Sequence, residues 1–235
     1  LCLGFTLACV KVDVSVISQG RGATDLTNPH WISLDDLKKL HSKESCNPSS
    51  RDVTKERQQT PAWCWAASAR MVMGYHNKSE TPSTPTDLQC DIVMNAFRPW
   101  IGETDCCEEK VPPDSINAPP VCVQGYWPYE VFNQYSFTYK SVAGPLDWEA
   151  LTGEICSAGP FITVIKWRGG GAHTFVVKGY NQEPQQTVEV YDPVLKDPQD
   201  MTFDEFVGDS PREEYEFHRF AHDRNIVQIL PKDRP

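Results

Sequence analysis

Cys64 is the residue whose type and setting most clearly allow covalent chemistry. It lies near the start of the run 61–76, PAWCWAASARMVMGYH, in which Pro61 precedes apolar residues on nearly every face of a predicted helix. Backbone N–H groups at the start of a helix stabilise a thiolate relative to a thiol, and the thiolate is the nucleophilic form of cysteine. Cys64 is therefore a candidate nucleophile; the alternative is a small, inert residue of a buried helix.

Gln58 lies six residues before Cys64 and offers a side-chain amide. An amide N–H and the backbone N–H of the nucleophile can together stabilise the oxyanion that forms in acyl transfer. The sequence therefore predicts an oxyanion site made by Gln58 and the Cys64 N–H. Gln59 is the competing donor if the loop differs by one residue.

His173 is the candidate base. Of the six histidines, it alone starts a strong strand directly after a glycine-rich turn, in the run 167–180, WRGGGAHTFVVKGY. Glycines there would let a substrate backbone approach closely, which makes Gly170 and Gly171 candidate substrate-binding residues. The alternative is a solvated histidine at the end of a strand.

Asp192 is the candidate third group, which would orient the imidazole and stabilise its cation. It lies 19 residues after His173, at the end of the next predicted strand. A turn centred near residue 183 or 184 places Asp192 opposite Phe175 and diagonal to His173, about 7–8 Å away between backbones and within side-chain reach. The alternative is that Asp192 only begins an Asp-Pro turn.

The elements that must position these residues change in character along the chain. Helical patterns come first, and β-rich runs divided by glycine and polar turns follow them. Helices before strands indicate an α+β fold with two lobes and a cleft between them. The predicted helices cover 34–41 behind Ser33 as N-cap, 61–76, 88–98 and 146–157. The predicted strands cover 161–167, 172–180 and 187–192 in an antiparallel meander, with an edge strand at 226–230.

The segment 58–68, QQTPAWCWAAS, resembles the nucleophile segment of papain-like cysteine peptidases, which have a Gln six positions before the Cys and a C-W-A-x-S continuation. The run 167–180 resembles their histidine-bearing strand. The likeness covers residues 56–207 and is closest to the branch that uses Cys, His and Asp, which includes secreted bacterial peptidases and plant-pathogen effector proteases. It implies a papain-like two-lobe fold, with the nucleophile on a buried helix of the N-terminal lobe and the His and Asp on an antiparallel sheet lobe.

The resemblance implies a thiol peptidase that needs no cofactor and no metal and acts on protein or peptide substrates. Cys64 would attack a carbonyl, His173 would take and return the proton, and Asp192 would hold the ring. Gln58 and the Cys64 N–H would hold the oxyanion, and water would release the acyl group. The alternatives are an acyl transferase or amidase on the same scaffold, and an inactive binding or toxin module.

Three tryptophans are candidates for binding apolar substrate side chains, because they lie beside the candidate catalytic residues in the sequence. These are Trp63, Trp65 and Trp167. Tryptophan next to a nucleophile is equally typical of packing, so the sequence leaves both interpretations open.

Nine cysteines among 235 residues are unusual for a cytosolic protein. Cys90, Cys106, Cys107 and Cys122 lie in or near a proline-rich stretch, and neighbours in the chain are poorly placed to bond each other. Two pairings remain: 90–106 with 107–122, or 90–107 with 106–122. A zinc site is the less favoured alternative, because no C-x-x-C motif is present; the resembled branch often carries a similar set of cysteines, which supports disulfides. Of the others, Cys156 is expected to be an inert core residue, and Cys46 has no obvious partner.

The first ten residues, LCLGFTLACV, carry no charge and resemble the end of a secretory signal peptide. One alternative is that this run forms a first β-strand. Another is lipid attachment at Cys9, which is the only membrane contact that we expect. The expected parts are therefore a leader or strand at 1–17, an N-terminal extension at 18–55, the catalytic domain at 56–207 and a C-terminal extension at 208–235.

The net charge of −10, with no long basic run, argues against a nucleic-acid partner. Together with the cysteine content, the apolar N-terminus predicts a secreted or extracytoplasmic protein.

Overall fold

The computed structural model describes residues 30–41, 46, 50–77, 89–107, 120–167, 170–208 and 220–232. The predicted leader and the candidate lipid site at Cys9 lie outside this part of the chain. Within it, no helix is both long and apolar enough to cross a membrane.

The described part of the chain contains six α-helices, and in four of them a side-chain cap or a proline at the start deals with backbone N–H groups that lack partners within the helix. The helices are α1 (Leu34–Leu40), α2 (Cys64–Asn77), α3 (Gln89–Ile101), α4 (Pro128–Gln134), α5 (Trp148–Ser157) and α6 (Phe203–Val207), with a 3-10 turn at Pro120–Val123. Ser33 accepts the N–H of Asp36 at 3.1 Å, which confirms the predicted N-cap of α1. Thr202 and Glu205 form a reciprocal capping box at α6.

The strands form one antiparallel sheet in the order β1-β6-β2-β3-β4-β5. They are β1 (Phe137–Ala143), β2 (Phe161–Trp167), β3 (Ala172–Asn181), β4 (Thr187–Tyr191), β5 (Gln199–Thr202) and β6 (Phe220–Pro231). The predicted meander is confirmed as β2, β3 and β4.

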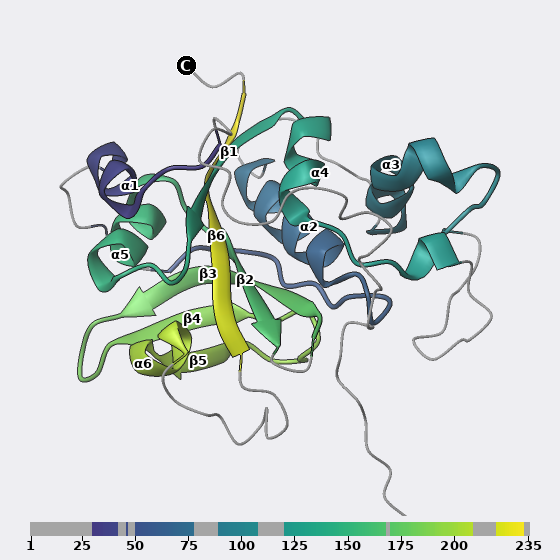
Figure 1. Cartoon of the computed structure of the whole chain (residues 1–235). Coiled ribbons are helices and arrows are strands. Elements are labelled where there is room, and N and C mark those ends of the chain that lie inside the picture. Colours follow the sequence, from purple (N-terminus) through teal and green to yellow (C-terminus); the bar gives the residue numbers. More distant parts are fainter. Residues whose placement is uncertain are drawn as a thin grey trace, which may run out of the picture.

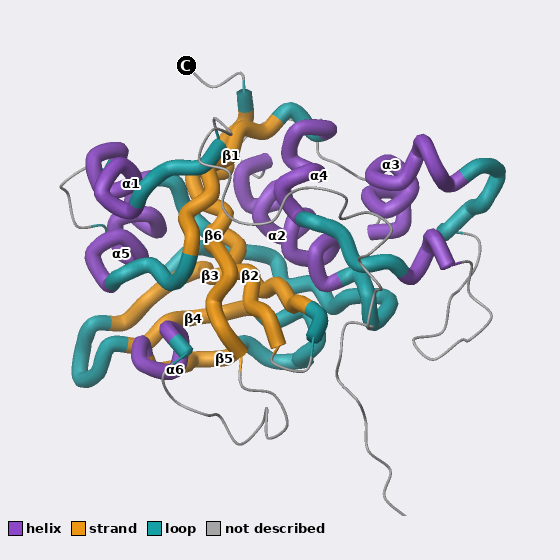
Figure 2. Tube along the Cα trace, in the orientation of Figure 1, coloured by secondary structure: helices purple, strands orange, loops and turns teal. Residues whose placement is uncertain are grey.

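Helices cover both faces of the sheet, as Figures 1 and 2 show, with α2, α3 and α4 on one side and α1 and α5 on the other. Because side chains alternate between the faces of a strand, neighbouring residues enter different cores. Ile162 and Val176 pack with α2, α3 and α4, whereas Phe161 and Val177 pack with α1, α5 and α6. This confirms the predicted α+β fold, with a helical lobe that contains α2 and a sheet that contains β3 and β4.

The final strand corrects one expectation. The run 226–230 was predicted to be an edge strand, but β6 lies inside the sheet, between β1 and β2. Segments on either side of 56–207 therefore share its structure: β6 completes the sheet, and Val53 enters the core of the helical lobe.

Three disulfides link six of the seven described cysteines. The structure contains Cys90–Cys107 and Cys106–Cys122, which is the second of the two predicted pairings. It also contains Cys46–Cys156, which joins residues 110 apart in the sequence. The expectation that Cys156 is an inert core residue was therefore wrong, because the fold brings its helix face to the segment that carries Cys46.

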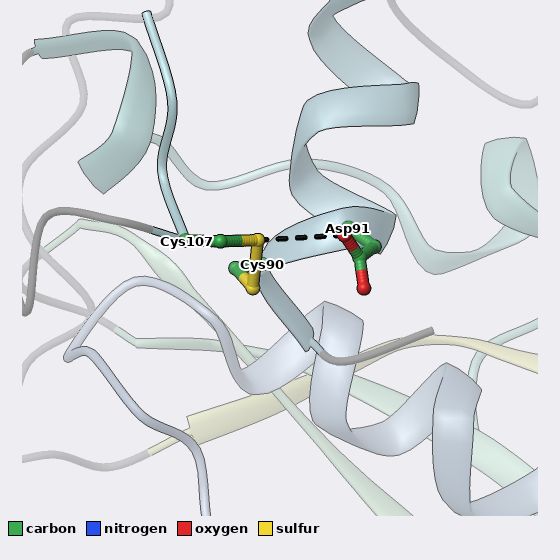
Figure 3. A group of neighbouring side chains, drawn as sticks. All are labelled: Cys90, Asp91 and Cys107. Carbon is green, nitrogen blue, oxygen red and sulfur yellow. Dashed lines mark hydrogen bonds between the residues drawn. A yellow bond between two sulfur atoms is a disulfide. The ribbon is translucent and has the colours of Figure 1, made fainter. Parts of the chain in front are cut away.

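Asp91 lies beside the Cys90–Cys107 disulfide, as Figure 3 shows, with its Oδ1 atom 3.4 Å from Cys107 Sγ. Three potential ligand atoms therefore come close together. Both sulfurs are committed to each other, however, and zinc binds the thiolate form of cysteine. The cluster is accordingly a disulfide with a neighbouring carboxylate.

Loss of the Cys46–Cys156 disulfide should destabilise the protein more than loss of Cys90–Cys107. In the chain-entropy description, closing 110 residues stabilises by about 5 kcal/mol and closing 17 by about 3 kcal/mol. Urea unfolding of the double variants Cys46→Ser/Cys156→Ser and Cys90→Ser/Cys107→Ser would measure the two losses in the free energy of unfolding. Both cysteines of each pair are replaced so that neither is left as an unpaired thiol. A smaller loss for the first pair would contradict the prediction.

Candidate active site

Cys64 is the first residue of α2 and is buried. Among the described cysteines it is the one outside a disulfide. Its side chain is hydrogen-bonded to the ring of His173. The structure thus brings together the two residues that the sequence singled out as nucleophile and base.

His173 lies near the start of β3, and its Nε2 atom is 2.9 Å from Asp192 Oδ1. Since Nε2 faces Asp192, Nδ1 is the ring nitrogen left for the sulfur of Cys64. The ladder between β3 and β4 pairs Val176 with Tyr191, so its continuation sets Asp192 beside Phe175, in the predicted register.

Asp192 also accepts the backbone N–H of Val194 at 2.8 Å, through the same Oδ1 atom that faces His173. An aspartate that bonds the backbone two residues on forms a common type of turn. In the structure Asp192 therefore begins a turn and also directs the same carboxylate oxygen toward the imidazole, so the two interpretations are compatible.

Burial alone would lower the pKa of His173, because it penalises the charged ring. The Asp192 carboxylate and the hydrogen-bonded Cys64 outweigh that effect and raise the pKa of His173 to about 10. At neutral pH the arrangement therefore favours an imidazolium between a carboxylate and a thiolate, which is the reactive state of a cysteine–histidine pair.

Two contacts that the sequence analysis missed hold this group together. Ser68 Oγ, one turn after Cys64 on α2, lies 3.3 Å from Thr174 Oγ1, next to His173 on β3. The Trp167 ring lies nearly parallel to the His173 ring, with 6.2 Å between centroids and 19° between planes. Neither contact has a local sequence signal, because the first depends on how α2 packs against β3 and the second on how β2 pairs with β3.

Gln58 is half-buried and its side-chain N–H donates to the carbonyl of Thr60 at 2.8 Å. Its backbone N–H donates to the carbonyl of Pro193 at 2.9 Å, which ties it to the residue after Asp192. The Gln59 side chain is exposed. Of the two glutamines, Gln58 is therefore the one whose position is fixed beside the candidate triad.

Trp63 and Trp65 correct the expectation that they line a substrate cleft. They are only 2% and 1% exposed, and their indole N–H groups donate to the carbonyls of Cys122 and Gln124. A buried indole with a satisfied N–H presents no surface to a substrate. Both residues instead anchor the 120–124 segment to the start of α2.

Gly170 and Gly171 lie in the turn between β2 and β3, with φ angles of 93° and 90°. Backbone hydrogen bonds join both to Trp167, at 3.0 and 3.1 Å. These φ values are strained for residues with a side chain, which explains glycine at both positions. Both glycines are exposed, and Ala172 alone separates them from His173.

The fold and the buried cysteine–histidine–aspartate series together define a papain-like cysteine peptidase. The solved structure of xylellain, a cysteine protease from Xylella fastidiosa, has a similar fold, with a TM-score of 0.53 at 11% identity over 90% of this chain and 95% of that one. Comparison with curated proteins found no match. Residues 48–210 match the family described as papain-like cysteine protease AvrRpt2, and the chain belongs to that family.

Proposed function

We propose that the chain is a cysteine endopeptidase, which hydrolyses peptide bonds through a thioester on Cys64. The observation that carries the proposal is the hydrogen-bonded series from Cys64 through His173 to Asp192, buried at the meeting of α2 and β3. A thiol and an imidazole held in this way are suited to acyl transfer.

The Cys64 sulfur attacks the substrate carbonyl carbon, and the C–S bond forms as the carbonyl oxygen takes the negative charge. His173 then gives its proton to the leaving nitrogen, the C–N bond breaks, and a thioester remains. Water attacks the thioester while His173 takes the proton of the water. The C–S bond breaks, which releases the carboxylic acid and regenerates the ion pair. Asp192 keeps the ring in one orientation through both steps.

Gln58 is proposed as the side-chain donor to the oxyanion, together with the Cys64 N–H. A glutamine amide has two N–H bonds, and one of them serves the Thr60 carbonyl. That bond orients the amide and leaves the second N–H for the oxyanion. An oxyanion donor that is already fixed before the reaction needs no reorganisation at the transition state.

Gly170 and Gly171 are proposed to border the substrate. The exposed glycines give a substrate backbone close access to the edge of the site, whereas Trp167 is only 7% exposed and packs against the His173 ring. Protein or peptide substrates follow from the family, and the preferred sequence would come from cleavage of a peptide library.

An extracytoplasmic place of action is part of the same proposal. Three disulfides in the described part of the chain support it, since disulfides persist in oxidising compartments. Among the described cysteines, the endopeptidase would then keep one reduced thiol, at Cys64, beside six that are already oxidised.

An epoxide or iodoacetamide probe should label Cys64 in preference to every other described cysteine of the unreduced protein. The reason is that the other six form disulfides, and that the His173 cation favours the Cys64 thiolate. Mass spectrometry of peptides from the labelled protein would locate the probe. The matched control is His173→Gln, which should lower the labelling rate at neutral pH. Equal labelling of both proteins would contradict the assigned pair.

A further inference from the structure

The segment 55–60 carries Gln58 and runs as loop up to α2. A loop by itself does not hold a catalytic amide to a fraction of an ångström, so its contacts with rigid elements decide how well Gln58 is placed. One such contact is the Gln58 N–H bond to Pro193. Another is the ion pair between Glu56 and Arg70 of α2, at 2.5 Å.

Gln89, the first residue of α3, makes the most direct contact with this segment. Its Oε1 accepts the backbone N–H of Gln59 at 3.1 Å, and its Nε2 donates to the backbone carbonyl of Arg57 at 2.8 Å. These two backbone groups flank Gln58 on either side. The same Nε2 lies 3.4 Å from the Glu56 carboxylate.

The burial of Gln89 makes these bonds matter. Gln89 is only 2% exposed. A buried amide without partners would cost free energy comparable to a lost hydrogen bond. The amide of Gln89 offers one acceptor and two donors, and its described bonds all go to residues 56–59. A glutamine amide has the shape of a peptide group, so it binds the loop as a neighbouring strand would.

We propose that Gln89 is a positioning residue for the oxyanion donor: by bonding the backbone on both sides of Gln58, it fixes the direction of the Gln58 amide. This inference rests on the proposed function, because it assumes that Gln58 serves the oxyanion. It adds α3 to the elements on which catalysis depends, although α3 carries none of the triad.

The test compares isosteric variants of Gln89 in the full-length, disulfide-bonded protein. Gln89→Met keeps the volume and removes all three hydrogen bonds of the amide to residues 56–59. It should lower kcat about 10-fold with KM nearly unchanged, which is part of the 10²- to 10³-fold effect of losing an oxyanion donor. The matched control on the same helix is Asn95→Leu, which removes the bond from Asn95 Nδ2 to Tyr135 and should leave kcat unchanged. The readout is kcat and KM on one peptide taken from the cleavage library.

Gln89→Glu adds a readout that a purely structural role would not produce. An ionised carboxylate cannot donate to the Arg57 carbonyl and lies beside Glu56, which Arg70 pairs. The protonated acid can donate again. The activity of this variant relative to wild type should therefore rise as the pH is lowered through the pKa of the new carboxyl, which the Glu56 charge raises.

The variant Gln58→Ala separates this inference from the proposed function. If Gln58→Ala lowers kcat and Gln89→Met has no further effect in that background, the positioning role is supported. Additive losses, or a Gln89→Met enzyme with wild-type kcat, would overturn it while leaving the oxyanion role of Gln58 intact. Wild-type kcat in Gln58→Ala would overturn both assignments.

Discussion

Replacing Cys64 with alanine is expected to lower the rate of peptide cleavage by at least about 10⁴-fold while the protein keeps its fold. The sulfur of Cys64 is the atom that would bond to the substrate, and no other described cysteine lies outside a disulfide to take its place. Alanine suits the buried start of α2, where Ala62, Ala66 and Ala67 are already packed. Casein or peptide-library cleavage measures the loss, and urea unfolding checks the fold.

Cys64→Ser is the matched variant, because it preserves the size of the side chain and offers an oxygen nucleophile. A serine hydroxyl beside the same imidazolium has a much higher pKa than a thiol, so the expected rate remains close to that of the alanine variant. If either variant retains cleavage within about tenfold of wild type, the acyl-enzyme mechanism on Cys64 is wrong.

The pairing of His173 with Asp192 could be predicted because it is local. Two adjacent strands joined by a short loop leave few registers, and the pairing of Val176 with Tyr191 agrees with a turn near residue 183 or 184. The register shifts between Val177 and Gly179, farther from the site. The part of the ladder next to His173 therefore keeps the predicted alignment.

The place of β6 could not be predicted, because its polar residues hide its burial. His222, Asp223, Arg224 and Asn225 follow one another, which reads as an exposed or edge segment. In the fold, Asn225 lies fully buried and accepts a hydrogen bond from Thr163 on β2 at 2.8 Å. Partners so distant in the chain make such a residue acceptable in a core, and no local pattern reveals them.

Arg224 gives a second example of the same difficulty. Its guanidinium lies 4.7 Å from the centroid of the Trp31 ring and 4.5 Å from that of Trp127, and it pairs with Asp223 at 2.6 Å. Cation–π contacts of this kind tie the segment before α1 and the start of α4 to β6. The segment at 18–55 therefore could not be recognised from the sequence as part of the same packed unit.

Removing the carboxylate of Asp192 should lower kcat on the order of 10²- to 10⁴-fold in Asp192→Ala, since the imidazole loses both its orientation and the charge that stabilises its cation. The Val194 N–H loses its partner as well, so the turn after β4 loosens. Cleavage of the same library peptide measures the effect, with urea unfolding to compare stability.

Asp192→Asn separates orientation from charge. An amide Oδ1 can still accept from His173 Nε2 and from the Val194 N–H, so the ring should keep its place. The loss of charge removes the main interaction that raises the pKa of His173 to about 10 against the effect of burial. The imidazolium then loses its proton at a lower pH, and the basic limb of the pH–rate profile should move to lower pH by on the order of 1 unit.

Asp197→Asn is the charge-matched control, because Asp197 lies in the same loop after β4 but is exposed. It should leave the basic limb in place, since water screens an exposed charge. The pH dependence of kcat/KM and the pH dependence of Cys64 alkylation would give two independent measurements of the pH at which the basic limb falls. A basic limb that stays in place or moves to higher pH in Asp192→Asn would mean that the Asp192 charge does not sustain the His173 cation. The third member of the series would then act through orientation alone.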